Sequence, residues 1–131
     1  MLNPKSKIQN SNLKSNNIRH RSYYFSIEVI LFAKKLKDKK VFYFIIDQLL
    51  RAATSIGANL IEAKGSGSKR EFARCLQIAL KSANETKYWL CLIRDSKLYT
   101  EPHLNILLAE ATEISNMIGS SLLTIRGKNK F

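Results

Sequence analysis

Hydrophobic residues recur along most of this chain at intervals of three and four, the spacing that places side chains on one face of an α-helix. No segment shows the alternation of apolar and polar residues that is typical of a strand. The pattern predicts four helices, at Ser22–Leu36, Val41–Lys64, Ser68–Ser96 and Thr100–Arg126. Because the connections are short, we expect an all-α fold, an antiparallel up-down-up-down four-helix bundle.

Each predicted helix carries an apolar stripe that we expect to face the core. The stripes consist of Phe25, Val29, Phe32 and Leu36; of Phe42, Ile46, Leu49, Ala53, Ile56 and Leu60; of Phe72, Leu76, Ala79, Ala83, Thr86 and Leu90; and of Leu104, Leu107, Ala111, Ile114, Ile118 and Ile125. Gly65 and Gly67 break the chain between the second and third helices, and Ser68 with Glu71 forms a capping box. This combination predicts a tight helical hairpin.

The composition places the bundle at residues 22–126, between a disordered basic tail over residues 1–21 and a short basic end over residues 127–131. The tail is rich in Asn, Ser and Lys and has no apolar period. It is either a solvated leader without a role or an arm that contacts nucleic acid.

The charge is strongly unbalanced, because 22 Lys and Arg residues face 10 Asp and Glu residues and give the 131-residue chain a net charge of +12. A polyanion is therefore the expected partner. One basic group lies at the end of the first helix, where lysines also complement the helix dipole: Lys34, Lys35, Lys37, Lys39 and Lys40. A second group, which could equally be an ordinary solvated face, belongs to a polar stripe about 27 Å long on the third helix: Arg70, Arg74, Gln77, Lys81, Asn84 and Tyr88.

The two cysteines, Cys75 and Cys91, fall in the same predicted helix about 24 Å apart, so they cannot form a disulfide with each other. Unpaired cysteines fit a reducing compartment. The chain has no run of about 18 apolar residues and no secretory leader, so we expect a cytoplasmic protein with no membrane contact.

Residues for catalysis or for metal binding are sparse. No glutamate has a histidine three residues on, and His20 and His103 are the two histidines of the chain, so neither a dinuclear metal site nor a zinc site can be assembled. We expect no metal and no cofactor. Gly65–Lys69 could hold one phosphate at a helix start, although a plain turn is favoured. Three polar residues could meet across the hairpin: Asn59, Glu62 and Glu85. They could form a hydrogen-bond network that fixes the register of the hairpin or a subunit contact, or the two carboxylates could act as a general acid/base pair.

The end of the third helix, residues 88–93, is apolar on all sides. A helix without a polar face must be covered from several directions, which one small bundle does poorly. We therefore expect self-association, with an interface that includes Tyr88, Trp89 and Leu92.

Three segments resemble one known family: QLLRAATSIGANLIEA (48–63), SKREFARCLQIAL (68–80) and NETKYWLCLI (84–93). It is the four helix bundle protein family, whose members are encoded in intervening sequences of bacterial 23S rRNA genes and are related to accessory variability determinants of diversity-generating retroelements. The resemblance covers roughly residues 22–125. It implies a non-enzymatic basic bundle that assembles as a homopentameric barrel and, in the retroelement branch, binds nucleic acid and a reverse transcriptase. The family's polar signature positions, which carry no catalytic role, are matched by Asn59, Glu62, Glu71 and Glu85.

The sequence thus predicts a nucleic-acid-binding accessory protein without catalysis, which contacts phosphates and reads few bases because few aromatic residues interleave with the basic ones. The expected contacts are Lys34, Lys35, Lys37, Lys39, Lys40, Arg70, Arg74 and Lys81. One alternative is an adaptor that docks a reverse transcriptase or another nucleic-acid enzyme through its basic surface. The other is an RNA-processing nuclease that would use Glu62 or Glu85 with a metal.

Overall fold

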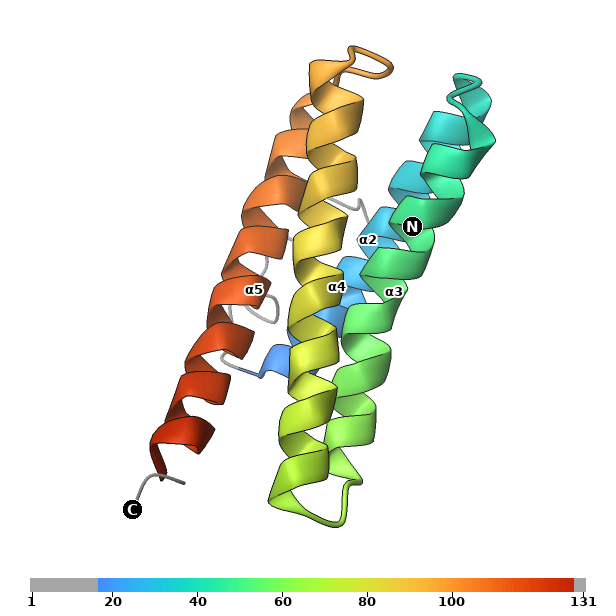
Figure 1. The fold of residues 1–131 in the computed structure, drawn as a ribbon. Coiled ribbons are helices and arrows are strands. Elements are labelled where there is room, and N and C mark those ends of the chain that lie inside the picture. Colours follow the sequence, from blue (N-terminus) through green and yellow to red (C-terminus); the bar gives the residue numbers. More distant parts are fainter. Residues whose placement is uncertain (1–16, 129–131) are drawn as a thin grey trace.

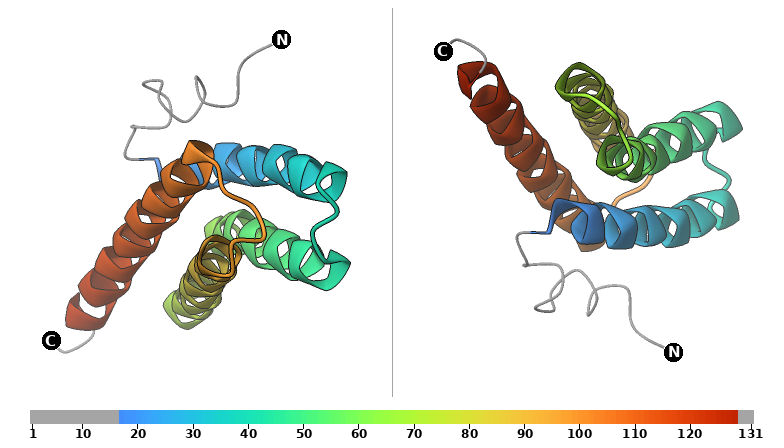
Figure 2. Two further views of the ribbon diagram at one scale, coloured as in Figure 1. Left: turned by 90° about the horizontal axis from the view of Figure 1, so that it is seen from above. Right: turned by 90° about the horizontal axis from the view of Figure 1, so that it is seen from below.

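The computed structural model describes residues 17–128, and these residues form four helices and no strand (Figure 1). The helices are α2 (Ile18–Asp38), α3 (Tyr43–Lys64), α4 (Lys69–Asp95) and α5 (Pro102–Lys128). Each helix packs against its neighbour in sequence, and α5 also packs against α2. Figures 1 and 2 show the α2–α3 and α4–α5 turns at one end of this four-helix bundle and the α3–α4 turn at the other. The predicted all-α class is confirmed.

α2 begins earlier than the sequence pattern predicts. Asn17 caps the helix, because its side-chain oxygen accepts hydrogen bonds from the amides of Arg19 and His20 at 3.1 and 3.2 Å. The predicted disordered tail is therefore wrong for residues 18–21, while residues 1–16 lie outside the described part of the chain. At the other end, α5 runs on to Lys128, past the predicted end near residue 126, and residues 129–131 are not described.

The α3–α4 hairpin is confirmed with half of its predicted capping box. The Ser68 hydroxyl accepts a hydrogen bond of 3.1 Å from the Glu71 amide. The Glu71 carboxylate accepts from Arg74 at 2.7 Å, so the predicted return to the cap amide is not made. Gly65 has a φ of −90°, a value open to any residue, so the turn does not depend on glycine at that position.

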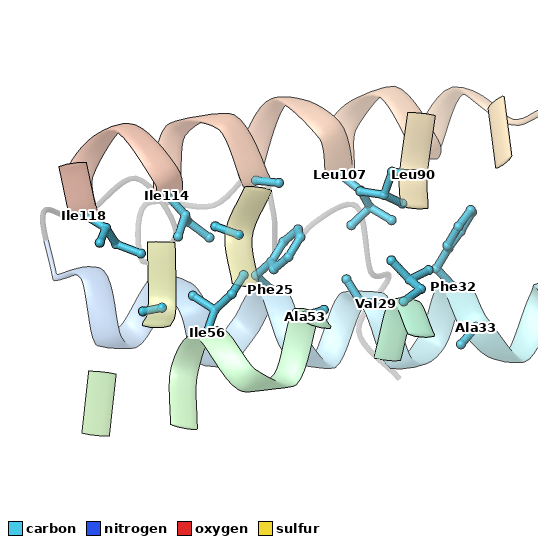
Figure 3. Packing of buried hydrophobic residues seen from close by; sticks show 14 of the residues in the cluster. Phe25, Val29, Phe32, Ala33, Ala53, Ile56, Leu90, Leu107, Ile114 and Ile118 are labelled. Carbon is cyan, nitrogen blue, oxygen red and sulfur yellow. The ribbon is translucent and has the colours of Figure 1, made fainter. Parts of the chain in front are cut away.

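The core fills the space between the four helices. Figure 3 shows Phe25 and Val29 of α2 beside Ile56 of α3 and Leu107 and Ile114 of α5, all fully buried. Burial of each such side chain contributes about 1.5–3 kcal/mol. The predicted stripes are confirmed except at three positions, since Phe72 and Ile125 are only partly buried and Phe42 is exposed.

Charged residues at seven-residue spacing join α2 to α5. Arg21, at the start of α2, donates two hydrogen bonds to Glu110 at 2.6 and 3.1 Å. One spacing further along, the buried Glu28 carboxylate lies 3.5 Å from Nε2 of the buried His103, and after another, Lys35 contacts Glu101 at 3.0 Å. Residues seven apart share one face of a helix. Glu101 is the residue before α5, so the three contacts fix how α5 and its start lie along α2.

Candidate nucleic-acid interface

Four of the five predicted lysines at the end of α2 are free to contact a ligand. Lys34, Lys37, Lys39 and Lys40 are exposed, and none of them has an acidic partner within residues 17–128. Lys35 differs, because its ammonium group is paired with Glu101. The end of α2 therefore presents four lysines that are not held in an ion pair among the described residues, with Asp38 as the one carboxylate between them.

The turn after these lysines is held by backbone hydrogen bonds. The Lys40 amide donates to the Lys37 carbonyl and the Val41 amide donates to the Leu36 carbonyl, both at 3.0 Å. These two hydrogen bonds define a Schellman motif, which usually has apolar residues at the positions of Leu36 and Val41. Both side chains are buried in the core. Lys40 has a φ of 58°, a left-handed conformation that glycine adopts at lower cost. The turn thus holds Lys39 and Lys40 on a defined backbone.

Three exposed aromatic residues follow the lysines after the buried Val41. Phe42 is 60% exposed, Tyr43 79% and Phe44 60%. The rings of Phe42 and Phe44 lie 6.4 Å apart between centroids, with planes 25° apart. The sequence predicts few aromatic residues among the basic ones, and the three rings of this turn lie after the lysines in the sequence. The sequence carries this signal as the run of aromatic residues after Val41, but the apolar spacing assigns Phe42 to the core.

The second basic group lies on another part of the bundle. All six residues of the predicted polar stripe on α4 are exposed, as expected. Arg70 and Lys81 have no acidic partner within the described residues, whereas Arg74 pairs with Glu71 at 2.7 Å and, through its hydrogen bond, lowers the pKa of Glu71. α3 has 22 residues and so extends roughly 33 Å, and its two ends carry the α2–α3 and α3–α4 turns. Lys40 and Arg70 therefore lie at opposite ends of the bundle and form separate surfaces.

The comparisons with known proteins agree with this architecture. The model of the 23S rRNA-intervening sequence protein family matches residues 14–120. The chain belongs to this family. A crystal structure of a protein with unknown function from the S23 ribosomal protein family of Bacteroides thetaiotaomicron VPI-5482 is similar, at 33% identity and a TM-score of 0.77. The similarity covers 80% of this chain and 97% of that one. A search of curated proteins finds no match.

In this intervening-sequence protein, the predicted polar residues do not gather into one site. Asn59 donates to the carbonyl and hydroxyl oxygens of Ser55, at 2.8 and 3.1 Å. The hydrogen bond that crosses the hairpin joins the hydroxyls of Ser55 and Ser82 at 2.9 Å. This register places Glu62 opposite the start of α4, roughly 15 Å along the hairpin from Glu85. Asn59, Glu62 and Glu85 therefore do not meet across the hairpin.

The residues predicted to form the interface between copies of the chain are partly exposed to solvent. Tyr88 is 59% exposed, and its ring meets the ring of Trp89 edge-on at 5.1 Å between centroids. Trp89 and Leu92 are partly exposed, while Leu90 and Ile93 are fully buried. The indole nitrogen of Trp89 is buried and has no hydrogen-bond partner within residues 17–128. Contact between copies through this segment stays a prediction.

The intervening-sequence protein has few groups for metal chemistry in the part that the structure describes. Within residues 17–128 there is no group of three or more His, Cys, Asp and Glu side chains placed to hold a metal ion. Cys75 and Cys91 are both free, as the helical spacing predicts. Over the same residues, no helix combines the length and hydropathy needed to cross a membrane.

Proposed function

We propose that this 23S rRNA-intervening sequence protein is a non-enzymatic, cytoplasmic accessory protein that binds RNA or DNA by contacts between its basic side chains and phosphates. The observation that carries the proposal is the set of exposed cations without an acidic partner among the described residues, at the end of α2 and along α4. Phosphate contacts position a nucleic acid without reading its sequence, so the protein discriminates weakly between sequences.

Two further observations support this function. The net charge of +12 favours a polyanion over a neutral ligand. The family description refers to an intervening sequence of 23S rRNA, and the similar crystal structure belongs to a family named after a ribosomal protein.

The assembly is part of the proposal. We infer an antiparallel, up-down-up-down bundle that forms a homopentamer through Tyr88, Trp89 and Leu92. The partial exposure of these three side chains supports the contact, and a ring of copies would multiply the field of each basic surface. Light scattering of the purified protein tests it, because a mass five times that of the chain is expected and a monomer would contradict it.

The α4 stripe is tested by an Arg70→Gln, Arg74→Gln, Lys81→Gln variant. A matched control, Arg51→Gln, Arg94→Gln, Lys97→Gln, removes the same charge elsewhere. We expect the stripe variant to weaken binding to all structured RNAs alike and to flatten the salt dependence of the affinity, while the control changes both less. Equal effects of the two variants would contradict the assignment of these contacts.

A further inference from the structure

Lysines and aromatic rings lie side by side at the α2–α3 turn, and we call these residues the lysine–ring patch: Lys34, Lys37, Lys39, Lys40, Phe42, Tyr43 and Phe44. We propose that the patch binds a single-stranded segment of nucleic acid, with phosphates on the lysines and unpaired bases stacked on the rings. The inference rests on the proposed function and narrows its ligand to unpaired nucleotides.

Exposed aromatic rings are unexpected at the start of a helix that has only a structural role. Phe42 occupies the N-cap of α3 and makes no capping hydrogen bond through its side chain. Serine, threonine, aspartate and asparagine are the residues that stabilise this position, and the N-caps of α2 and α4, Asn17 and Ser68, follow that rule. Phe42 therefore stands where a stabilising cap is usual, and with Tyr43 and Phe44 it forms a run of three exposed rings, as expected where a surface serves binding.

The chemistry of the patch suits unpaired bases. Every base has an aromatic face, so stacking on Phe or Tyr strengthens binding roughly 5- to 150-fold per base with little regard to sequence. The rings of Phe42 and Phe44 are 25° from parallel, so they offer their faces in similar orientations. In a duplex the bases already stack on each other, and the rings gain nothing from it.

The start of α3 adds an attraction for phosphate. Its first turn contains no acidic residue, and no side chain caps its free amides. A helix N-terminus carries partial positive charge and binds anions through such amides. The first backbone amides of α3 belong to the residues that bear the exposed rings, and the lysines precede them in the sequence.

A lipid surface fits the patch less well. A helix that lies on a membrane needs a long apolar face, but Ile45 and Ile46, which continue α3 after the rings, are buried in the core. At this turn the exposed apolar surface therefore consists of the three rings, next to four lysines without an acidic partner among the described residues.

The test compares the wild-type protein with a Phe42→Leu, Tyr43→Leu, Phe44→Leu variant, which keeps apolar side chains and removes the ring faces. Tyr23, which is 61% exposed elsewhere on α2, provides the matched control Tyr23→Leu. The probes are a labelled oligouridine of about 15 nucleotides and its duplex with oligoadenine. We expect the triple variant to lose at least fivefold in affinity for the single strand and little for the duplex, with an unchanged salt slope.

The possible failures are distinguishable. If the wild-type protein binds neither probe, the proposed function itself fails. If it binds both and the triple variant binds both as well as wild type, the proposed function stands and the inference is overturned. A changed oligomer mass, or ring-dependent binding to phosphatidylserine vesicles with unchanged RNA affinity, would also overturn it.

Photo-crosslinking locates the contact independently. Trypsin releases residues 41–51 as one peptide that contains the three rings and no other aromatic residue, whereas Tyr88 and Trp89 fall in the peptide of residues 88–94. With an oligonucleotide that carries 5-iodouridine, we expect crosslinks in the first peptide. Crosslinks confined to the second would contradict the inference.

Discussion

The two ends of α2 are both basic, but their charges do different things. At the start, Arg21 is 6% exposed and its guanidinium group contacts Glu110 and Glu113 of α5. At the end, the lysines of the lysine–ring patch project into solvent without acidic partners among the described residues. The difference lies in α5, which offers carboxylates to one end of α2 and leaves most of the other end unopposed. Net charge alone therefore overstates the surface available to a polyanion.

Charged side chains at the two ends of α2 also contribute differently to folding stability, because only Arg21, at the start, is buried. A buried ion pair gains strong Coulomb attraction but is costly to desolvate, and removal of one partner leaves an uncompensated charge inside the protein. Exposed charges are screened by water and salt, and each contributes little to folding. We therefore expect substitutions at the start of α2 to change stability and those at its end to change binding.

The largest expected effect is at Arg21. Arg21→Met leaves Glu110 buried without its partner and should lower the free energy of unfolding by about 3–5 kcal/mol. Urea denaturation measures this change, and Arg19→Met on the same helix is the control with little expected effect. A loss below about 1 kcal/mol would put Arg21 in the same class as the exposed lysines.

Lys40→Gly should change stability and binding in opposite directions. Glycine relieves the left-handed backbone at φ 58° and should stabilise the fold by about 0.5–1 kcal/mol. Loss of one phosphate contact should reduce the salt slope by roughly 0.7. Lys97, which also has a φ of 58°, supplies the control, because Lys97→Gly should give the same stabilisation without the change in binding. If Lys97→Gly weakens RNA binding as much as Lys40→Gly does, the loss of binding is not specific to the lysine–ring patch.

The smallest expected effect concerns the cluster around Glu101, whose carboxylate accepts hydrogen bonds from Lys35 at the end of α2 and from Tyr99. Burial opposes the charge of Glu101, but hydrogen bonds from Tyr99 and Lys35 outweigh it and lower the pKa of that carboxyl group. Its contribution to stability is therefore present above about pH 4.5, the unperturbed value, and is lost as the pH falls through the lower pKa of the folded state.

The same cluster acts in the opposite sense at high pH. The hydrogen bond to Glu101, together with burial, raises the pKa of Tyr99 to about 12, so its contribution is present below pH 10 and is lost as the pH rises towards 12. Glu101→Gln should return the Tyr99 titration, followed by tyrosinate absorbance, towards 10 and remove the acid-side loss. An unchanged titration would show that Glu101 does not perturb Tyr99.

Helical spacing was sufficient to predict most of the fold. Phe25, Leu49 and Ile114 lie in apolar stripes that recur over several turns, and a long periodic pattern fixes which face is buried. Phe42 continued such a pattern but lies one residue before α3 begins, so it is exposed. Periodicity identifies a buried face but does not locate the first residue of a helix.

The charged contacts could not be predicted in the same way, because they depend on how one helix lies along another. In the sequence, Arg21 belongs to a basic tail, and only the packing of α5 against α2 places Glu110 beside it. Glu28, between Phe25 and Phe32, did carry a signal, since it occupies a core-spaced position on α2 and lies buried near His103. Register in the hairpin, set where Ser55 meets Ser82, likewise decides which polar residues can meet.

The most direct test of the account is the salt dependence of affinity for single-stranded RNA, compared between wild type and a Lys34→Gln, Lys37→Gln, Lys39→Gln, Lys40→Gln variant. Four single-strand phosphate contacts account for a slope of roughly 2.8, which corresponds to a loss of roughly 50-fold in affinity between about 50 and 200 mM salt. We predict that the variant loses this part of the slope and that a control with Arg51, Arg94, Lys97 and Arg126 changed to Gln keeps it. A variant with the wild-type slope and affinity would contradict the assignment of nucleic-acid binding to the end of α2.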